Sequence, residues 1–235
     1  MAPDYRINMA KEDFDKLIKT ADTFGMEYKI LSSEKNVKII PSRESIKSKY
    51  IEVPSIGLVV PKERTLFNNN FYECQEKLHA NNEKMLTPNE FREFLKVAKE
   101  NDINLYNEIT QVRSPWRAEW LDADFKYENN KMFVEYHKFD ENGKIKKIRE
   151  ELDKNTLMKD KIPGISLESW LENSTSQGLP KTTVSEGNLY YWTPDKNNNS
   201  VARFDASSYG ADLVAYGVPS YWYSNLGVRA AKYKL

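Results

Sequence analysis

The residues best suited to chemistry in this chain are few and lie far apart. Its two histidines are His79 and His137, and its one cysteine is Cys74. Cys74 and His79 fall on one predicted helix at a spacing that does not make their side chains converge, which argues against a nucleophile activated by histidine. We interpret His79 as a half-exposed surface side chain of a helix and His137 as a surface residue of a strand. A single cysteine also excludes an intramolecular disulfide.

A pair of acidic residues is the other candidate for chemistry. Asp122 and Asp124 fall on one face of a predicted strand, where two carboxylates could bind a metal or transfer protons. A solvated strand face is the favoured interpretation. An enzyme remains an open alternative, in which the pair acts with Arg113 and Arg117 in one concave pocket. The chain has no Gly-rich phosphate loop, no His-Glu-x-x-His and no Cys-x-x-Cys. We therefore expect no catalytic residue, no metal and no cofactor.

The composition excludes several classes of partner. The chain has 235 residues, with 35 basic and 35 acidic side chains, so no overall positive field attracts nucleic acid or an anionic membrane. Its 14 Tyr, 10 Phe and 5 Trp are enough to form a core. No apolar run approaches the roughly 18 residues of a membrane helix, and the first residues lack the pattern of a signal peptide. We expect no nucleic-acid partner and no membrane insertion. The location is left open between the cytoplasm and a virion.

Apolar spacing and turn residues predict the order of elements. A helix is expected at residues 11–23, followed by strands at 27–31, 37–40 and 50–53. Pro54 marks a boundary, and a buried strand follows at 56–60. The next helix is expected at 68–81, and another begins at Thr87, which has the features of an N-cap, with Pro88 at the first helical position and Glu90 completing a capping box.

The remainder of the chain is predicted to be strand and loop. Residues 116–125 and 131–139 flank Asn129 and Asn130 and predict a hairpin. Residues 143–176 are a long polar stretch in which we expect one short helix, at 167–171. An aromatic strand is predicted at 189–192.

The C-terminal segment has an unusual amino-acid composition. Residues 205–225 contain no Lys, Glu, Gln or Met, although the whole chain has 26 Lys, 22 Glu, 3 Gln and 6 Met. At this composition such a gap has a chance of about one in several hundred. The segment consists mainly of Tyr, Ser, Gly, Ala, Asp and Val, which is typical of a paratope that combines rigid aromatic anchors with small adaptable residues. A terminal sheet of closely packed small residues is the alternative.

Two regions of the chain carry a family resemblance. The helical pair resembles the two-helix opening of the C-type lectin fold, in its formylglycine-generating-enzyme branch, through Phe71, Cys74, Leu78, Met85, Leu86, Thr87, Pro88, Glu90 and Phe91. Residues 226–231 (Leu-Gly-Val-Arg-Ala-Ala), after 201–204, resemble the closing strands of that branch. Together they are similar to the variable proteins of diversity-generating retroelements, particularly those of archaea and archaeal viruses. The resemblance covers about residues 56–235.

That resemblance implies a particular origin for the amino-acid composition of the C-terminal segment. In the family, mutagenic reverse transcription rewrites template adenines, so that AAC codons give a set of amino acids without Lys, Glu, Gln, Met and Trp. Within residues 205–225 only Trp222 departs from this rule. The chain also departs from neighbouring families. It has neither the Glu-Pro-Asn calcium loop nor the Trp-Asn-Asp triplet of sugar-binding lectins, and it lacks the cysteine pair of formylglycine-generating enzymes.

The predicted architecture is therefore an α+β C-type lectin-like domain at residues 55–235 with a small N-terminal α/β appendage at 1–54. Within 201–229, fixed apolar residues are expected to form a frame, namely Val201, Phe204, Leu213, Pro219, Leu226 and Val228. The side chains between them are expected to face solvent and to bind ligand as the variable set. These are Asp205, Ser207, Tyr209, Gly210, Asp212, Val214, Tyr216, Gly217, Val218, Ser220, Tyr221, Trp222 and Tyr223.

The functional expectation is non-catalytic binding of a variable protein or cell-surface ligand. The alternative is a structural or assembly module, for example a virion component whose C-terminal sheet packs against a partner. The two hypotheses differ in the exposure of four tyrosines. If the segment binds ligands, at least three of Tyr209, Tyr216, Tyr221 and Tyr223 should be open to solvent, on the same side as Asp205 and Asp212.

Overall fold

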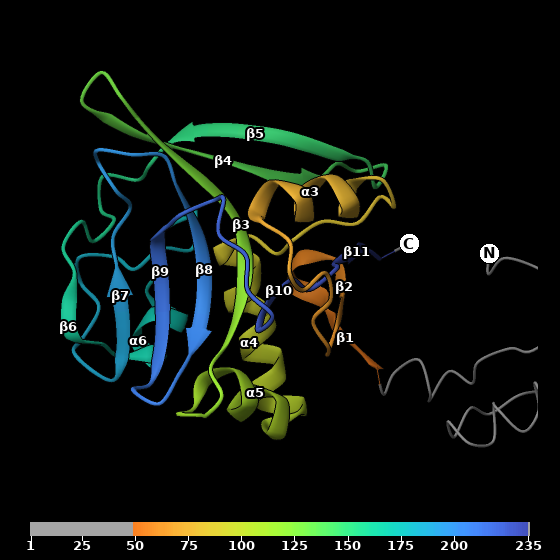
Figure 1. Ribbon diagram of the computed structural model, residues 1–235, viewed down its shortest axis with the longest axis horizontal. Coiled ribbons are helices and arrows are strands. Elements are labelled where there is room, and N and C mark those ends of the chain that lie inside the picture. Colours follow the sequence, from red (N-terminus) through yellow and green to blue (C-terminus); the bar gives the residue numbers. More distant parts are fainter. Residues whose placement is uncertain (1–48, 235) are drawn as a thin grey trace, which may run out of the picture. The chain divides into compact units, whose positions relative to one another are not determined.

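A computed structural model describes residues 49–234, in which helices and two β-sheets give an α+β architecture (Figure 1). The helix predicted at 11–23 and the strands predicted at 27–31 and 37–40 lie outside the described residues. In the described part of the chain, no helix is both long and apolar enough to cross a membrane.

A small sheet joins the first described strand to the last. Its order is β1 (Tyr50–Val53), β2 (Leu58–Pro61) and β11 (Lys232–Tyr233), with a 3-10 turn, η1 (Pro54–Ile56), between the first two strands. Strand β11 runs antiparallel to β2. The strand predicted at 50–53 is confirmed, and its inward residues Ile51 and Val53 are buried in the main core.

The helices begin where side chains can cap them. Asn70 caps α3 (Phe71–His79), and its side chain accepts a hydrogen bond from the backbone N–H of Glu73. The predicted capping box of α4 (Pro88–Asn101) is confirmed, because Thr87 accepts from the Glu90 N–H while Glu90 accepts from the Thr87 N–H. The short α5 (Ile103–Thr110) follows at once. The predicted helix at 167–171 is α6 (Leu167–Glu172).

The large mixed sheet has eight strands. Seven follow the order β5 (Ile145–Glu151), β4 (Lys131–Phe139), β3 (Arg117–Glu128), β8 (Ser200–Ala206), β9 (Ala211–Gly217), β7 (Leu189–Trp192) and β6 (Lys161–Ile165). The eighth, β10 (Leu226–Gly227), runs parallel to β3. The predicted hairpin is confirmed as β3 and β4, whose turn residues Asn129 and Asn130 both have positive φ.

Different elements cover the two faces of this sheet (Figure 1). On one face, Phe204 packs against Phe91 of α4 and stacks on Trp170 of α6, with ring centroids 5.1 and 6.0 Å apart. On the other face, Phe71 of α3 meets Trp120 of β3 edge-on, with centroids 5.8 Å apart. Because helices pack on both faces of β3, its residues from Arg117 to Phe125 are all buried.

This double cover makes the expectation of a solvated Asp122–Asp124 face wrong. Both carboxylates are buried, and the pairing of β3 with β8 shifts register between Leu121 and Asp124. Gln75 of α3 donates to Asp122 (2.9 Å), and the hydroxyl of Tyr72 donates to Asp124 (2.9 Å). The backbone N–H of His137 also donates to Asp122 (2.8 Å). The pair therefore holds α3 and β4 against β3 instead of facing water.

Candidate ligand-binding face

Part of the large sheet remains uncovered on the side that carries α3. Cross-strand pairing places Arg203 opposite Val214 and Asp205 opposite Asp212, and the parallel pairing of β7 with β9 adds Tyr190 and Trp192 beside them. Residues paired directly across strands share a face. We call this surface the open face; it consists of Tyr190, Trp192, Arg203, Asp205, Asp212, Val214 and Tyr216.

The centre of the open face is polar. The Nε of Arg203 donates to both carboxylate oxygens of Asp205, at 3.1 and 2.8 Å. The indole N–H of Trp192 donates to Asp212 (3.1 Å), and its ring meets Tyr216 edge-on with centroids 5.6 Å apart. This arrangement fixes the carboxylates and leaves aromatic edges around them.

Burial perturbs both carboxylates of the open face. Loss of solvent raises the pKa of Asp205 to about 6, against the lowering effect of Arg203. Burial also raises the pKa of Asp212, which the hydrogen bond from Trp192 partly opposes. Asp205 therefore carries a proton in part at mildly acidic pH, and the charge of the open face changes there.

The segment that joins β9 to β10 crosses the same side of the sheet (Figure 1). We call it the 218–225 loop. Three backbone carbonyl groups hold this loop in place. The carbonyl of Pro219 accepts a hydrogen bond from the N–H of Phe71 (3.1 Å), and the carbonyl of Tyr223 accepts one from the N–H of Asn68 (3.3 Å). The carbonyl of Asn225 accepts one from the N–H of Ala118 (2.9 Å). The aromatic side chains of the loop project from this fixed backbone.

The exposure expected of the four tyrosines is confirmed. The exposed fractions are 84% for Tyr209, 43% for Tyr216, 47% for Tyr221 and 44% for Tyr223, and Trp222 is 61% exposed. Tyr216 shares the open face with Asp212, four residues before it on β9. Tyr221 and Tyr223 pack edge to face, and Tyr223 meets Trp116, with centroids 6.1 and 5.6 Å apart. Tyr209 lies at the tip of the β8–β9 hairpin.

The predicted frame is also largely as expected. Val201, Phe204, Leu213, Leu226 and Val228 are fully buried, while Pro219 is half-buried in the loop. Ser207 and Asp212 are half-buried, and Val218 and Ser220 are exposed, in keeping with a surface role.

The expectation that all members of the variable set face solvent is wrong at four positions. Asp205 and Val214 are buried, and each lies on a central strand of the large sheet, β8 or β9. Gly217 is also buried, and a Cβ added there would lie 2.7 Å from the carbonyl oxygen of Val201. Gly210 is buried with a φ of +142°, a region that side chains strongly disfavour.

Three aromatic residues of this surface were not foreseen as site residues. Tyr190 and Trp192 lie on β7, and Trp116 precedes β3, all outside the C-terminal segment that drew attention by composition. The alternation of the predicted 189–192 strand places Tyr190 and Trp192 on one face and Tyr191 on the other, so the signal for two of them was present in the sequence.

The four residues of the enzyme hypothesis do not gather in one pocket. Arg113 and Arg117 pair with Glu108, whereas Asp122 contacts His137 (3.2 Å) and Asp124 contacts Lys126 (2.7 Å). Asp122 lines a cleft of about 210 Å³ whose lining includes none of the other three.

The cysteine and the two histidines lie in surroundings that do not activate them for catalysis. Burial raises the pKa of Cys74 to about 12, so its thiol stays protonated at neutral pH. The His79 and His137 rings lie 4.4 Å apart, and burial together with His137 lowers the pKa of His79. Within residues 49–234, no three His, Cys, Asp or Glu residues are grouped to hold a metal ion.

No protein-family model matches the chain, and no curated protein or solved structure is significantly similar to it.

Proposed function

We propose that this protein is a non-catalytic ligand-binding protein with a C-type lectin-like domain, and that its C-terminal segment is diversified by a retroelement to bind variable protein or cell-surface ligands. The observation that carries the proposal is the division within residues 201–228. Exposed rings alternate there with a buried apolar frame. Such a division lets surface side chains change without disturbing the core.

The chemistry of the surface is suited to protein recognition. Tyr and Trp bury a large area while few side-chain rotations are frozen, so Tyr216, Tyr221, Trp222 and Tyr223 would be the energetic anchors. The order of elements also supports the resemblance, since α3 and α4 precede every strand of the large sheet, as a two-helix opening does. The four buried positions narrow the proposed ligand-contacting set, because Gly210 and Gly217 cannot vary freely.

The alternative is a structural or assembly module. In that case the same exposed rings would pack permanently against one fixed partner, and substitutions among them would disrupt an assembly. No feature of the described residues favours this alternative over variable binding.

Two libraries of matched size would test the proposal. The first varies Tyr209, Tyr216, Tyr221 and Tyr223 among the amino acids that adenine changes in AAC produce. The control library varies Val201, Phe204, Leu213 and Leu226 in the same way. We expect most members of the first library to fold and some to bind hen egg-white lysozyme after selection, whereas most of the control library should not fold. Equal losses of folding in the two libraries would refute the proposal.

A genomic comparison gives an independent test of diversification. We expect a near-copy of the coding segment for residues 201–229 beside a reverse-transcriptase gene, with differences confined to adenines of the copy. Differences spread over all four bases would contradict the retroelement mechanism. They would favour the alternative of a structural or assembly module.

A further inference from the structure

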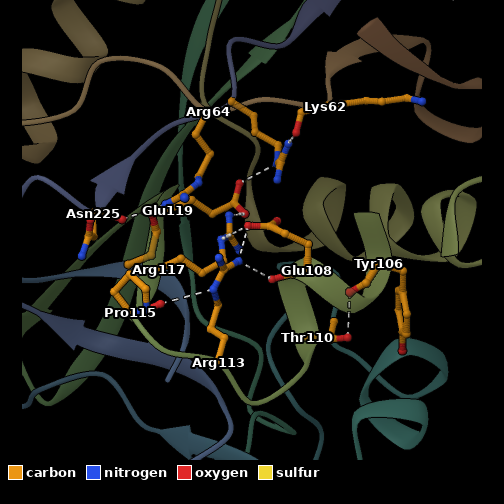
Figure 2. A network of polar contacts seen from close by, with 12 residues as sticks. Lys62, Arg64, Tyr106, Glu108, Thr110, Arg113, Pro115, Arg117, Glu119 and Asn225 are labelled. Atoms are coloured by element: carbon orange, nitrogen blue, oxygen red, sulfur yellow. Dashed lines mark hydrogen bonds and ion pairs between the residues drawn. The ribbon is translucent and has the colours of Figure 1, made fainter. Parts of the chain in front are cut away.

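A cluster of arginines lies on the far side of β3 from the open face, beside α5. Arg64, Arg113 and Arg117 converge with Glu108 around Glu119 (Figure 2). Arg117 donates to Glu119, and the Nε of Arg229 lies 2.9 Å from the other carboxylate oxygen of Glu119. Arg113 and Arg117 both pair with Glu108.

The charges of this cluster do not balance. Arg64, Arg113, Arg117 and Arg229 bring four guanidinium groups to the carboxylates of Glu108 and Glu119. Arg117 and Arg229 are almost fully buried, and the Nη1 of Arg117 has no hydrogen-bond partner among the described residues. Uncompensated positive charge in a buried place is unfavourable, and a bound anion would relieve it.

Burial and the neighbouring charges both perturb the pKa values of the cluster. Burial and repulsion from Arg117 lower the pKa of Arg64 to about 10. Burial also lowers the pKa of Arg229, although Glu119 opposes this. Burial would raise the pKa of Glu119, but Arg229 and Arg117 hold it below its usual value.

A cleft opens onto Arg64, Glu108 and Arg229 of this cluster, while Arg113, Arg117 and Glu119 lie behind its lining. It has a volume of about 520 Å³ and is lined by Lys62, Arg64, Phe67, Leu105, Glu108 and Arg229, among others. Lys62 is paired with Asp102 across the cleft (2.7 Å), and Glu63 stands exposed in its lining. The volume falls in the range of small-molecule sites. Phe67 and Leu105 supply apolar wall, while Arg64 and Arg229 supply donors.

We infer that this cleft is a second binding site, separate from the open face, and that it takes a small phosphate monoester. The guanidinium forks of Arg64 and Arg229 match the geometry of phosphate oxygens, and a dianion bound against them would offset the surplus positive charge of the cluster behind the cleft. The volume beyond the phosphate group accommodates a small organic group against Phe67 and Leu105. The inference does not depend on the proposed function, because none of these residues belongs to the open face or the 218–225 loop.

Calorimetric titration with two probes, inorganic phosphate and phenyl phosphate, tests the inference at an ionic strength held constant with sodium chloride. We expect both probes to bind saturably, with phenyl phosphate several-fold tighter because its ring contacts the apolar wall. Arg64→Gln should weaken binding by about tenfold or more. Arg149→Gln, which removes an exposed arginine of β5, is the matched control and should leave binding unchanged.

A second variant keeps the test decisive if Arg64→Gln folds poorly, since Arg64 also donates to Ala118 and Asn225. Glu63→Gln removes an exposed carboxylate from the cleft lining and should tighten phosphate binding by about two- to threefold. Binding that does not saturate, or that is unchanged in both Arg64→Gln and Glu63→Gln, would overturn the inference. If inorganic phosphate binds as tightly as phenyl phosphate, the assignment to a monoester is wrong.

Discussion

The division between frame and surface predicts very different costs for two substitutions in one segment. Phe204 is fully buried between Phe91 and Trp170, so Phe204→Ala removes a whole ring from contact with two others and leaves a cavity. We expect a loss of about 3–5 kcal/mol in the free energy of unfolding. Tyr221 is 47% exposed and lies on the 218–225 loop, so Tyr221→Ser should cost under about 1 kcal/mol.

Urea denaturation followed by far-ultraviolet circular dichroism measures both values. Because the two variants differ little in the surface exposed on unfolding, the slope of free energy against urea should be unchanged and the midpoint alone should move. Leu213→Ala is a second frame variant, and Tyr209→Ser is a second surface variant, with the same expected contrast. Similar costs for the two classes would refute the division into frame and surface.

Three further predictions concern backbone, protonation and metal. Gly217→Ala should lower the melting temperature by several degrees, because its Cβ would approach the Val201 carbonyl oxygen to 2.7 Å, whereas Tyr216→Ala should change it little. The carboxyl carbon of Asp205 should titrate in NMR with a midpoint near 6; since this folded-state pKa lies above the unfolded value, ionisation of Asp205 opposes folding, and its contribution should lower stability as pH rises from about 4 to 6. A midpoint near 4 would contradict the burial of that carboxylate. Adding a calcium chelator should leave the melting temperature unchanged, and a drop of several degrees would show that a metal stabilises the fold.

Local signals in the sequence predicted the elements that depend on them. Thr87, Pro88 and Glu90 define the start of α4 because a capping box is a contact among neighbours along the chain. The Asn129–Asn130 turn defines the β3–β4 hairpin for the same reason, since both residues tolerate positive φ.

Elements with weak local signals, or with burial that depends on distant partners, were not predicted. Strand β5 has the sequence IKKIREE, with little apolar alternation. It is an edge strand that pairs with β4 through its backbone and through cross-strand ion pairs such as Lys147–Glu135. Likewise, the burial of Asp122 and Asp124 depends on α3, which lies about fifty residues earlier and supplies Gln75 and Tyr72 as partners.

The candidate site was predicted in part for the same physical reason. Composition identified the exposed tyrosines, because the unusual amino-acid content of residues 205–225 can be read from the sequence alone. It could not identify Gly217 as fixed, since the obstacle is the carbonyl oxygen of Val201 on the neighbouring strand. It also could not identify the arginine cluster around Glu119, which brings together Arg64, Arg117 and Arg229 from three separate parts of the chain.

The anchoring of the 218–225 loop has a consequence for the entropy of association. Its contacts with Asn68, Phe71 and Ala118 are made by backbone carbonyl groups, so they are the same whichever side chains the loop carries. Fixing a free backbone costs about 1–2 kcal/mol per residue. A ligand that binds this loop meets a backbone that is already ordered, and most of that cost has been met by folding. Side chains of the loop can therefore be substituted to suit a different ligand, and binding of that ligand does not have to order the loop backbone again.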